Sequence, residues 1–130
     1  MANPIATKNG ICFAFPDILN TPAGPSMVPM PYPNIAQLSA ATGTATNVNA
    51  GGKPVILKSS EIANSSGGEP GTGMGVSSGT HLGKCTFTKS SNTVKANGKG
   101  IVRQFDTTDQ NGGNAKGQVM VGFPTVLVGD

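Results

Sequence analysis

The chain has 130 residues, of which 12% are charged, and a formal net charge of +3. Its nine basic residues are spread from Lys8 to Lys116 without a basic run or interleaved aromatic residues, which argues against a nucleic-acid partner. No stretch reaches the ~18 apolar residues of a membrane-spanning helix. The N-terminus lacks the charged and apolar regions of a secretory signal peptide. We therefore expect a cytoplasmic protein that leaves the cell only by a route other than general secretion.

Glycine and proline are unusually frequent, with 19 and 10 residues, whereas tryptophan is absent and tyrosine occurs once. Such a composition also occurs in disordered chains. The low charge and the short clusters of β-branched residues between turn residues favour an ordered fold instead. We predict one all-β domain over residues 1–130, built from short strands and hairpins.

The first apolar segment is Ile11–Phe15, a predicted strand that we expect Pro16 to end. Asp17–Leu19 is a candidate for one helical turn. The following stretch, residues 21–33, is rich in proline, which has no backbone N–H and is therefore excluded from a central strand. We expect this stretch to run extended or polyproline-like over a surface as a strap.

A short phrase occurs twice in the chain. Residues 48–56 read Val-Asn-Ala-Gly-Gly-Lys-Pro-Val-Ile, and residues 94–102 read Val-Lys-Ala-Asn-Gly-Lys-Gly-Ile-Val. In both copies a β-branched residue leads into a tight turn, and two β-branched residues follow. This pattern predicts two related hairpins and an internal pseudo-repeat of β units.

The remaining segments are assigned more coarsely. Residues 61–64 are predicted to form one helical turn capped by Ser59 or Ser60. Residues 65–79 are rich in Gly and Ser and predict a loop. A second loop at 109–117 precedes residues 118–128, whose alternating pattern predicts one closing strand.

Two groups of residues are candidates for catalysis. Cys85 lies four residues after His81, the only histidine, and a helix would bring the two together. Gly83 and the glycine-rich approach favour a strand or loop instead, so a Cys/His dyad is disfavoured and Cys12 and Cys85 are expected as buried thiols. Asp106 and Asp109 follow an apolar strand and are interpreted as turn residues, with Asp106 paired to Arg103. We identify no catalytic residues and expect no enzyme.

A metal site has few candidate ligands. Structural zinc takes four Cys or His ligands, and the chain offers three, namely Cys12, His81 and Cys85. A zinc site would need a carboxylate, a water or a second chain to complete it. We therefore expect no cofactor, with zinc at these residues as the alternative.

Several motifs resemble, in order, the PAAR-like family of spike-tip proteins. Pro31-Tyr32-Pro33-Asn34-Ile35 resembles the family signature. The other matching segments are residues 11–17, which resemble its opening strand, residues 68–72 and 79–85, which resemble its middle loop and following strand, and residues 94–106, which resemble its second hairpin. The resemblance covers roughly residues 10 to 113.

The resemblance implies a small β-rich cone that caps the trimeric spike, VgrG-like, of a type VI secretion system or related contractile injection machine. One copy would cap each trimer, sharpen the needle for membrane puncture and help to load effector or adaptor proteins. It implies a cytoplasmic protein before firing, delivery out of the cell by the machine and transient contact with a target membrane. Because the chain ends at Asp130, we expect any toxin to be a separate protein docked on it.

The chain departs from the family at one place. PAAR-like relatives often carry apical histidines in the region of Gln104 and Gln110, and glutamine is a poor zinc ligand. The resemblance therefore leaves the apical metal in doubt. Two other functions remain as alternatives, a small hydrolase that uses Cys85 and His81, and a free-standing adhesin or binding module.

Overall fold

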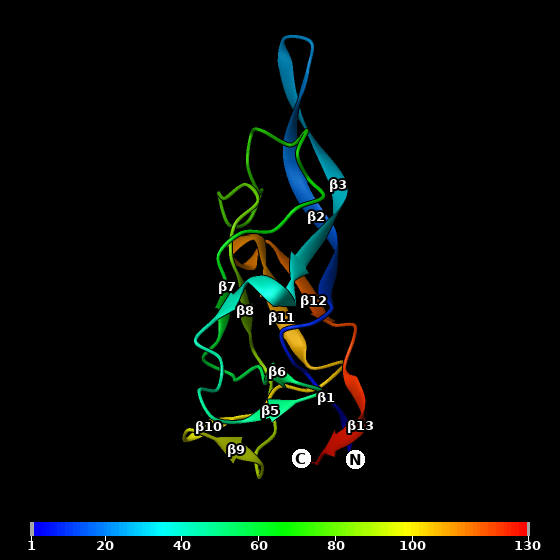
Figure 1. Cartoon of the computed structure of the whole chain (residues 1–130). Helices are drawn as coiled ribbons and strands as arrows, with labels where there is room; N and C mark the ends of the chain where they lie inside the picture. The colour runs from blue at the N-terminus through cyan, green and yellow to red at the C-terminus, as the bar shows by residue number, and fades with distance from the viewer. Residues whose placement is uncertain (1, 130) are drawn as a thin grey trace.

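The computed structural model, which describes residues 2–129, is all-β and predominantly antiparallel, as the sequence predicted. It tapers from a broad end that holds both termini to a narrow hairpin at the opposite end (Figure 1). A seven-stranded sheet has the order β3-β2-β12-β11-β8-β7-β4. Its strands are β2 (Ile11–Ala23), β3 (Ser26–Gln37), β4 (Ala41–Thr42), β7 (Glu61–Ile62), β8 (Cys85–Phe87), β11 (Thr107–Gln110) and β12 (Ala115–Val119).

Three two-stranded sheets form the broad end. They pair β1 (Asn3–Ile5) with β13 (Phe123–Val128), β5 (Asn49–Ala50) with β6 (Lys53–Pro54), and β9 (Lys95–Ala96) with β10 (Lys99–Gly100). The last two are the hairpins that the repeated phrase predicted. Two short 3-10 helices, η1 (Leu38–Ala40) and η2 (Asn111–Gly113), complete the described elements. No helix among residues 2–129 is long and apolar enough to cross a membrane.

The long hairpin of β2 and β3 corrects two predictions. Pro16 does not end the first strand, and Asp17–Leu19 is not helical, because β2 runs on to Ala23. The register with β3 shifts between Ala14 and Asp17, and this irregularity accommodates Pro16 within the strand. Beyond the shift, pairing is continuous from Asp17 with Tyr32 to Ala23 with Ser26.

The proline-rich stretch, residues 21–33, covers the end of β2, the turn and most of the edge strand β3. The prediction that it is not a central strand is confirmed, because β12 pairs with β2 only at residues 12–14 and residues 21–23 pair with β3. The prediction of a separate strap is wrong, because the part of the stretch in β3 pairs with β2. Pro29 and Pro31 face Asn20 and Ile18 at alternate positions, which an edge strand tolerates where the missing N–H groups would point away from the ladder.

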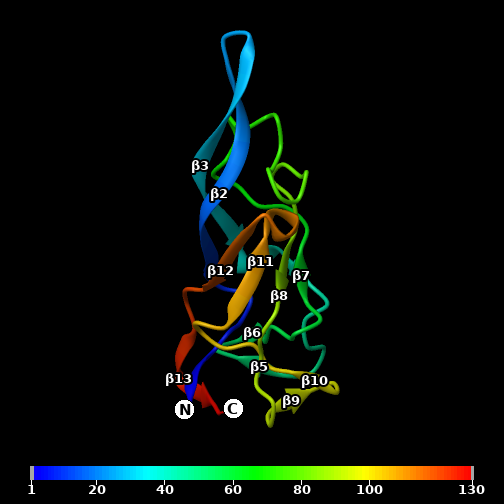
Figure 2. The same ribbon diagram turned by 180° about the vertical axis from the view of Figure 1, so that it is seen from behind.

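Three further predictions fail. The predicted loop at 109–117 contains the end of β11, the 3-10 helix η2 and the start of β12. Residues 61–64 do not form a helical turn, because Glu61–Ile62 is strand β7, which pairs with β4 and β8. The Ser60 hydroxyl accepts a bond from Leu57 N–H and donates to the Gly43 carbonyl instead of capping a helix. Residues 118–128 are not one strand, because the chain leaves β12 after Val119 and pairs with β1 at the broad end (Figure 2).

Apolar side chains gather in two clusters along the taper. The upper cluster lies inside the sheet and contains Ala6, Cys12, Ala36, Leu38, Ala41, Ile56, Ile62, Cys85, Phe87, Val102 and Val119. The lower cluster lies under the three two-stranded sheets and contains Ile5, Ala45, Ala50, Val55, Leu57, Ala96, Ile101 and Val128. Alanine is frequent in both clusters, so the strands and turns approach one another closely.

The predicted Gly/Ser loop at 65–79 packs against the long hairpin. A Cβ atom added at Gly68 or Gly71 would collide with the side chain of Leu19, which is fully buried. Asn20 N–H donates to the Met74 carbonyl at 2.9 Å, so the loop also continues the backbone bonding of β2. The loop therefore depends on glycine because the backbone lies directly on a buried leucine.

Candidate docking surface

Three short segments join at the broad end in a closed ring of backbone hydrogen bonds. Ala6 N–H donates to the Val102 carbonyl at 3.0 Å, Val102 N–H to Ile56 at 2.9 Å, and Ile56 N–H to Ala6 at 2.9 Å. A second set of N–H to carbonyl bonds closes the ring in the opposite direction, from Lys8 to Pro54 at 3.1 Å, Lys58 to Gly100 at 2.9 Å and Gln104 to Pro4 at 2.8 Å. Residues 4–8, 54–58 and 100–104 are therefore related by a pseudo-threefold axis.

The segments are arranged head to tail. Thr7 bridges Val55, Leu57 bridges Ile101, and Arg103 bridges Ile5, so the end of each segment meets the start of the next. The middle residues Ala6, Ile56 and Val102 belong to the upper cluster, whereas Ile5, Val55 and Ile101 belong to the lower cluster. The ring is thus a layer between the two cores, and we call it the triangle.

Each side of the triangle continues into one of the three two-stranded sheets. The pairs Ala50 with Lys53, Ala96 with Lys99 and Val128 with Asn3 occupy corresponding positions. The first two hairpins close through two-residue turns with positive φ, at Gly51 and Gly52 and at Asn97 and Gly98. The third pairs strands from opposite ends of the chain. We call the three hairpins and the triangle the base.

Sequence reasoning missed this third unit because its two strands are far apart in the sequence. Residues 125–128 read Thr-Val-Leu-Val, similar to Thr-Val-Lys-Ala at 93–96, and Pro4-Ile5 matches Pro54-Val55. Placing residues 125–128 in front of residues 4–5 and comparing them with the repeated phrase could have revealed the third unit. The internal repeat is therefore threefold, and its third copy is split.

Equivalent valines occur in the three hairpins. Val48 and Val94 accept hydrogen bonds from Val55 N–H at 3.2 Å and from Ile101 N–H at 3.1 Å. Val126 precedes Val128 by two residues, as Val48 and Val94 precede Ala50 and Ala96, and is their counterpart in the sequence, although the register of the third hairpin shifts there and pairs Ile5 with Phe123. Val94 and Val126 are 37% and 36% exposed, and Val48 packs partly against the lower cluster. Each hairpin of the base therefore carries a valine at this position.

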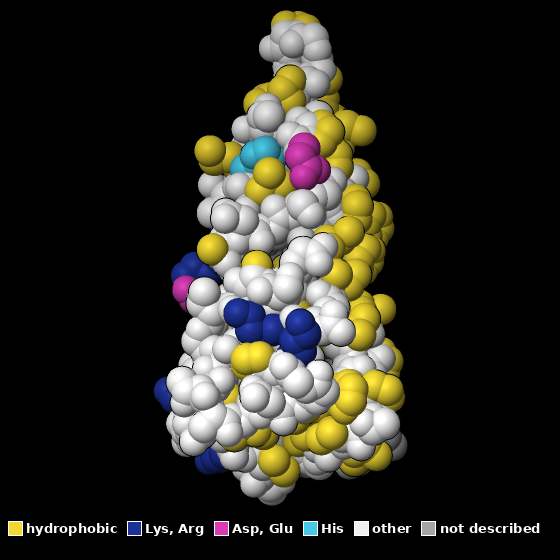
Figure 3. Space-filling view, viewed as in Figure 1, with side chains coloured by type: hydrophobic (Ala, Val, Ile, Leu, Met, Phe, Trp, Pro, Cys, Tyr) yellow, Lys and Arg dark blue, Asp and Glu magenta, His cyan; other side chains and the backbone are white. Residues whose placement is uncertain are grey.

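Lysines are concentrated at the base. Lys53 and Lys99 are equivalent in the hairpins, and Lys8 and Lys58 are equivalent at the ends of the triangle segments. Lysine and arginine side chains are visible as a group on the lower front surface in Figure 3. The surface ion pairs of the described residues, Lys84 with Glu61 and Lys116 with Asp109, involve the sheet instead. The base therefore has a positive surface.

One corner of the triangle is held by a buried ion pair. Arg103 Nη2 lies 2.9 Å from Asp106 Oδ1 and Arg103 Nε lies 3.0 Å from Oδ2, and both side chains are 2% exposed. Arg103 Nη1 also donates to the Gly129 carbonyl at 3.3 Å. The predicted pair is confirmed, but it is buried and bidentate, so it orders the corner and links it to the segment after β13.

A second buried polar group lies at the root of the long hairpin, where the Asp17 carboxylate is fully buried. It accepts hydrogen bonds from amide groups of Asn34 at 3.3 Å, Asn111 at 3.2 Å and Asn114 at 2.6 Å. No buried side-chain polar atom among the described residues lacks a partner. We call these residues, with Gln110, the amide cluster.

Gln110 occupies the centre of the molecule and not an open ligand position. Its amide donates to Asn34 Oδ1 at 2.9 Å and to the Asn34 carbonyl at 3.0 Å, and its oxygen accepts from the Thr108 hydroxyl at 2.8 Å. Gln104 donates to the Met120 carbonyl at 3.1 Å. Within residues 2–129 no group of three or more His, Cys, Asp or Glu side chains could hold a metal ion. The residues present therefore do not fit an apical metal.

The three candidate ligands lie in different settings. His81 Nε2 contacts the Gly68 carbonyl at 2.9 Å and belongs to the upper loops. Cys12 and Cys85 are fully buried, unpaired as disulfides, and packed in the upper cluster. A hydrogen bond with the Cys85 thiol, together with burial, raises the pKa of Cys12 far above its usual range. A thiol held in the neutral form is a poor nucleophile.

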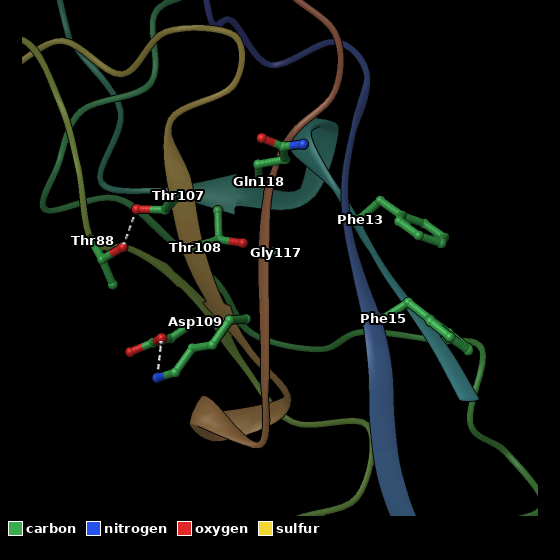
Figure 4. A pocket seen from close by; sticks show the side chains of 9 residues that line it. Phe13, Phe15, Thr88, Thr107, Thr108, Asp109, Gly117 and Gln118 are labelled. Carbon is green, nitrogen blue, oxygen red and sulfur yellow. Dashed lines mark hydrogen bonds and ion pairs between the residues drawn. The ribbon is translucent and has the colours of Figure 1, made fainter. Parts of the chain in front are cut away.

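A shallow groove of about 660 Å³ crosses the outer face of the sheet (Figure 4). Phe13 and Phe15 of β2 line one side, and the opposite side carries the Thr88 and Thr107 hydroxyls, which are 2.7 Å apart. Lys116 Nζ bonds to Asp109 Oδ1 at 2.6 Å. The lining contains no cysteine, serine or histidine that could act as a nucleophile with its base.

The chain belongs to the toxin PAAR-like domain family, whose sequence model matches residues 10–117. The resemblance noted from the sequence motifs is thereby confirmed. The chain is also 33% identical over 120 residues to a protein of Pseudomonas aeruginosa described as the DNase toxin Tse7. That match covers 90% of this chain but 30% of the relative. No solved structure matches the chain.

The split hairpin makes a prediction about circular permutation. A permutant that joins Asp130 to Asn3 and opens the chain between Gly51 and Gly52 keeps every strand pair of the base. We expect its free energy of unfolding to stay within about 1 kcal/mol of the parent, because exposed turns tolerate new ends. Chemical denaturation followed by circular dichroism measures this. An unfolded permutant would contradict the assignment of the third hairpin.

The amide cluster predicts a large effect of Asp17→Ala. The substitution removes one acceptor from each of three amide groups, two of which are buried, and we expect a loss of about 3 kcal/mol in the free energy of unfolding. Asp109→Ala is the control, because it removes a solvent-exposed ion pair worth less than about 1 kcal/mol. Equal losses in urea denaturation would show that the cluster does not stabilise the fold.

The thiols make a third prediction. Because both are buried and the pKa of Cys12 is raised, neither should react with Ellman's reagent in the native chain at pH 7, whereas two per chain should react in denaturant. The absorbance of the released thiolate measures the reaction. Rapid native labelling of either cysteine would contradict the structure and would favour the cysteine-dependent hydrolase.

Proposed function

We propose that this chain is a spike-tip domain of a type VI secretion or related contractile injection system, and that one copy caps the blunt end of a trimeric, VgrG-like spike. The observation that carries the proposal is the pseudo-threefold triangle with its three equivalent hairpins. A single chain with this base can offer nearly the same contact to each subunit of a trimer. A monomer without such symmetry would leave two of three identical partner surfaces unmatched.

Three features of the base suit this role. The partly exposed valines of the hairpins supply apolar contact area at equivalent positions. The lysines attract carboxylates on the partner and favour association at low salt. The hairpin turns are short and rich in glycine, so the partner can approach the backbone closely.

In this proposal the chain itself is not an enzyme, and it binds no metal. The buried thiols, the hydrogen-bonded glutamines and the absence of a ligand cluster among residues 2–129 support this view. Its cargo is a toxin, either docked on the chain or carried in one polypeptide with it. The Pseudomonas aeruginosa relative, which is described as a DNase toxin, supports a link to toxin delivery, because part of its sequence is similar to this chain. The narrow end then leads the particle to the target membrane, with which contact is transient.

Stoichiometry tests the proposal. Native mass spectrometry of the chain mixed with trimeric spike proteins from the same organism should give one copy per trimer. The double variant Val94→Asp and Val126→Asp should weaken binding at least tenfold, because carboxylates replace partly exposed apolar groups at a buried contact. Val76→Asp is the matched control, because Val76 is 55% exposed in the upper loop.

Three copies per trimer would contradict the capping role, as would binding that the Val76 variant weakens as much as the double variant. Raising the salt concentration should weaken docking, because the lysines of the base lose their attraction to the partner.

A further inference from the structure

The narrow end of the molecule is a two-stranded arm formed by residues 18–33 of β2 and β3 (Figure 1). Its outer part has no apolar core of its own. Met27, Val28 and Met30 are 51%, 40% and 43% exposed, and five prolines lie between Thr21 and Asn34. Exposed apolar side chains gathered on one protruding element commonly mark a surface that meets an apolar partner.

The arm carries no charge. No Asp, Glu, Lys, Arg or His occurs from Ile18 to Gly52, although the chain as a whole has 16 such residues. At its root, Asp17 is buried in the amide cluster, and the exposed Glu69 lies on the loop that packs against Leu19 and accepts a hydrogen bond from Gly67 N–H. An electrostatic partner is therefore disfavoured for this end, in contrast to the basic base.

The edges of the arm offer few free backbone donors. Asn20 N–H bonds to Met74, and the Ile18 carbonyl accepts from Val76, so these residues turn their backbone groups away from β3. Pro29, which pairs with Asn20, and Pro31, which pairs with Ile18, turn their backbone groups toward the other edge of the arm. Proline has no N–H group to expose at that edge. Pro22 removes a further donor near the tip. An apolar phase penalises unsatisfied N–H groups heavily, and this arm presents few of them.

The uncovered part of the arm is short. The loop at 71–76 bonds to β2 as far as Asn20, Thr21 is buried, and Gly73 lies against the Met27 side chain, so the uncovered part of β2 begins at Pro22. Two strand residues, Pro22 and Ala23, lead to the turn, and at ~3.3 Å per residue they extend about 7 Å. This matches the ~5–10 Å depth of the headgroup and acyl boundary and is far less than the ~30 Å of a hydrocarbon core.

We propose that the tip of the arm is a lipid-insertion wedge that enters one leaflet to the headgroup and acyl boundary and does not cross the bilayer. This inference rests on the proposed function in one respect, namely that the narrow end points away from the spike. The partner is the apolar region of a bilayer, with no requirement for anionic headgroups. A protein strand added to the arm is disfavoured, because the prolines remove the donors that strand pairing needs.

Reporter tryptophans test the depth directly, since the chain has none. Val28→Trp places the reporter on the arm, and Met120→Trp is the matched control on the body, where Met120 is 37% exposed. With phosphatidylcholine vesicles, Val28→Trp should shift its emission to the blue and be quenched more by lipids brominated near the headgroup than by those brominated near the chain end. Met120→Trp should change little.

Charge variants test which residues drive binding. Met27→Glu with Val28→Glu should weaken vesicle binding at least tenfold, whereas Met120→Glu should leave it unchanged. Binding should be similar for neutral and anionic vesicles and should survive high salt. No blue shift for Val28→Trp with any vesicle would overturn the proposal. So would binding that needs anionic lipid and is lost at high salt, because this would assign it to the lysines of the base.

The two proposals fail independently. The arm variants should keep one copy per spike trimer, and the double valine variant of the base should keep vesicle binding. Loss of vesicle binding with intact spike docking overturns the wedge alone. Loss of spike docking with intact vesicle binding overturns the cap alone.

Discussion

The structure depends on three short strands that cannot all pair side by side and that instead close a triangle through backbone hydrogen bonds. The cycle from Ala6 to Val102 to Ile56 satisfies the donor and the acceptor of each middle residue. It also separates two apolar clusters, so that the seven-stranded sheet stands on one face and the three hairpins cover the other. The arm, the amide cluster and the base are all positioned relative to this layer.

The two ends of the molecule differ in charge, in internal symmetry and in the contacts that support them. The base is repetitive, basic and partly apolar, with equivalent residues at equivalent places. The arm is uncharged and stands on a buried polar network in which Asp17 receives amide donors from three residues. The hydrogen bonds of the amide cluster share the Asp17 carboxylate and therefore form together. They fix the orientation of the arm relative to the sheet.

The sequence was sufficient for the all-β class, the family and two of the three hairpins, because those hairpins are contiguous and share a phrase. It was insufficient where the decisive contacts join distant residues. The third hairpin pairs Asn3 with Val128, and the amide cluster joins Asp17 to Asn111, so no local pattern reveals either. Pro16 does not end the strand as predicted, because a shift in register, invisible in the sequence, lets β2 continue past it. The buried setting of Gln110 was equally invisible, although the resemblance had marked that position as unusual for a metal site.

The most direct measurement of the central claim is a cryo-electron microscopy reconstruction of the chain on a trimeric spike, refined without imposed symmetry. The account predicts density for one chain, with each of the three hairpins over a different spike subunit and the arm pointing outward. Density with the arm or the face of the sheet against the spike would contradict it.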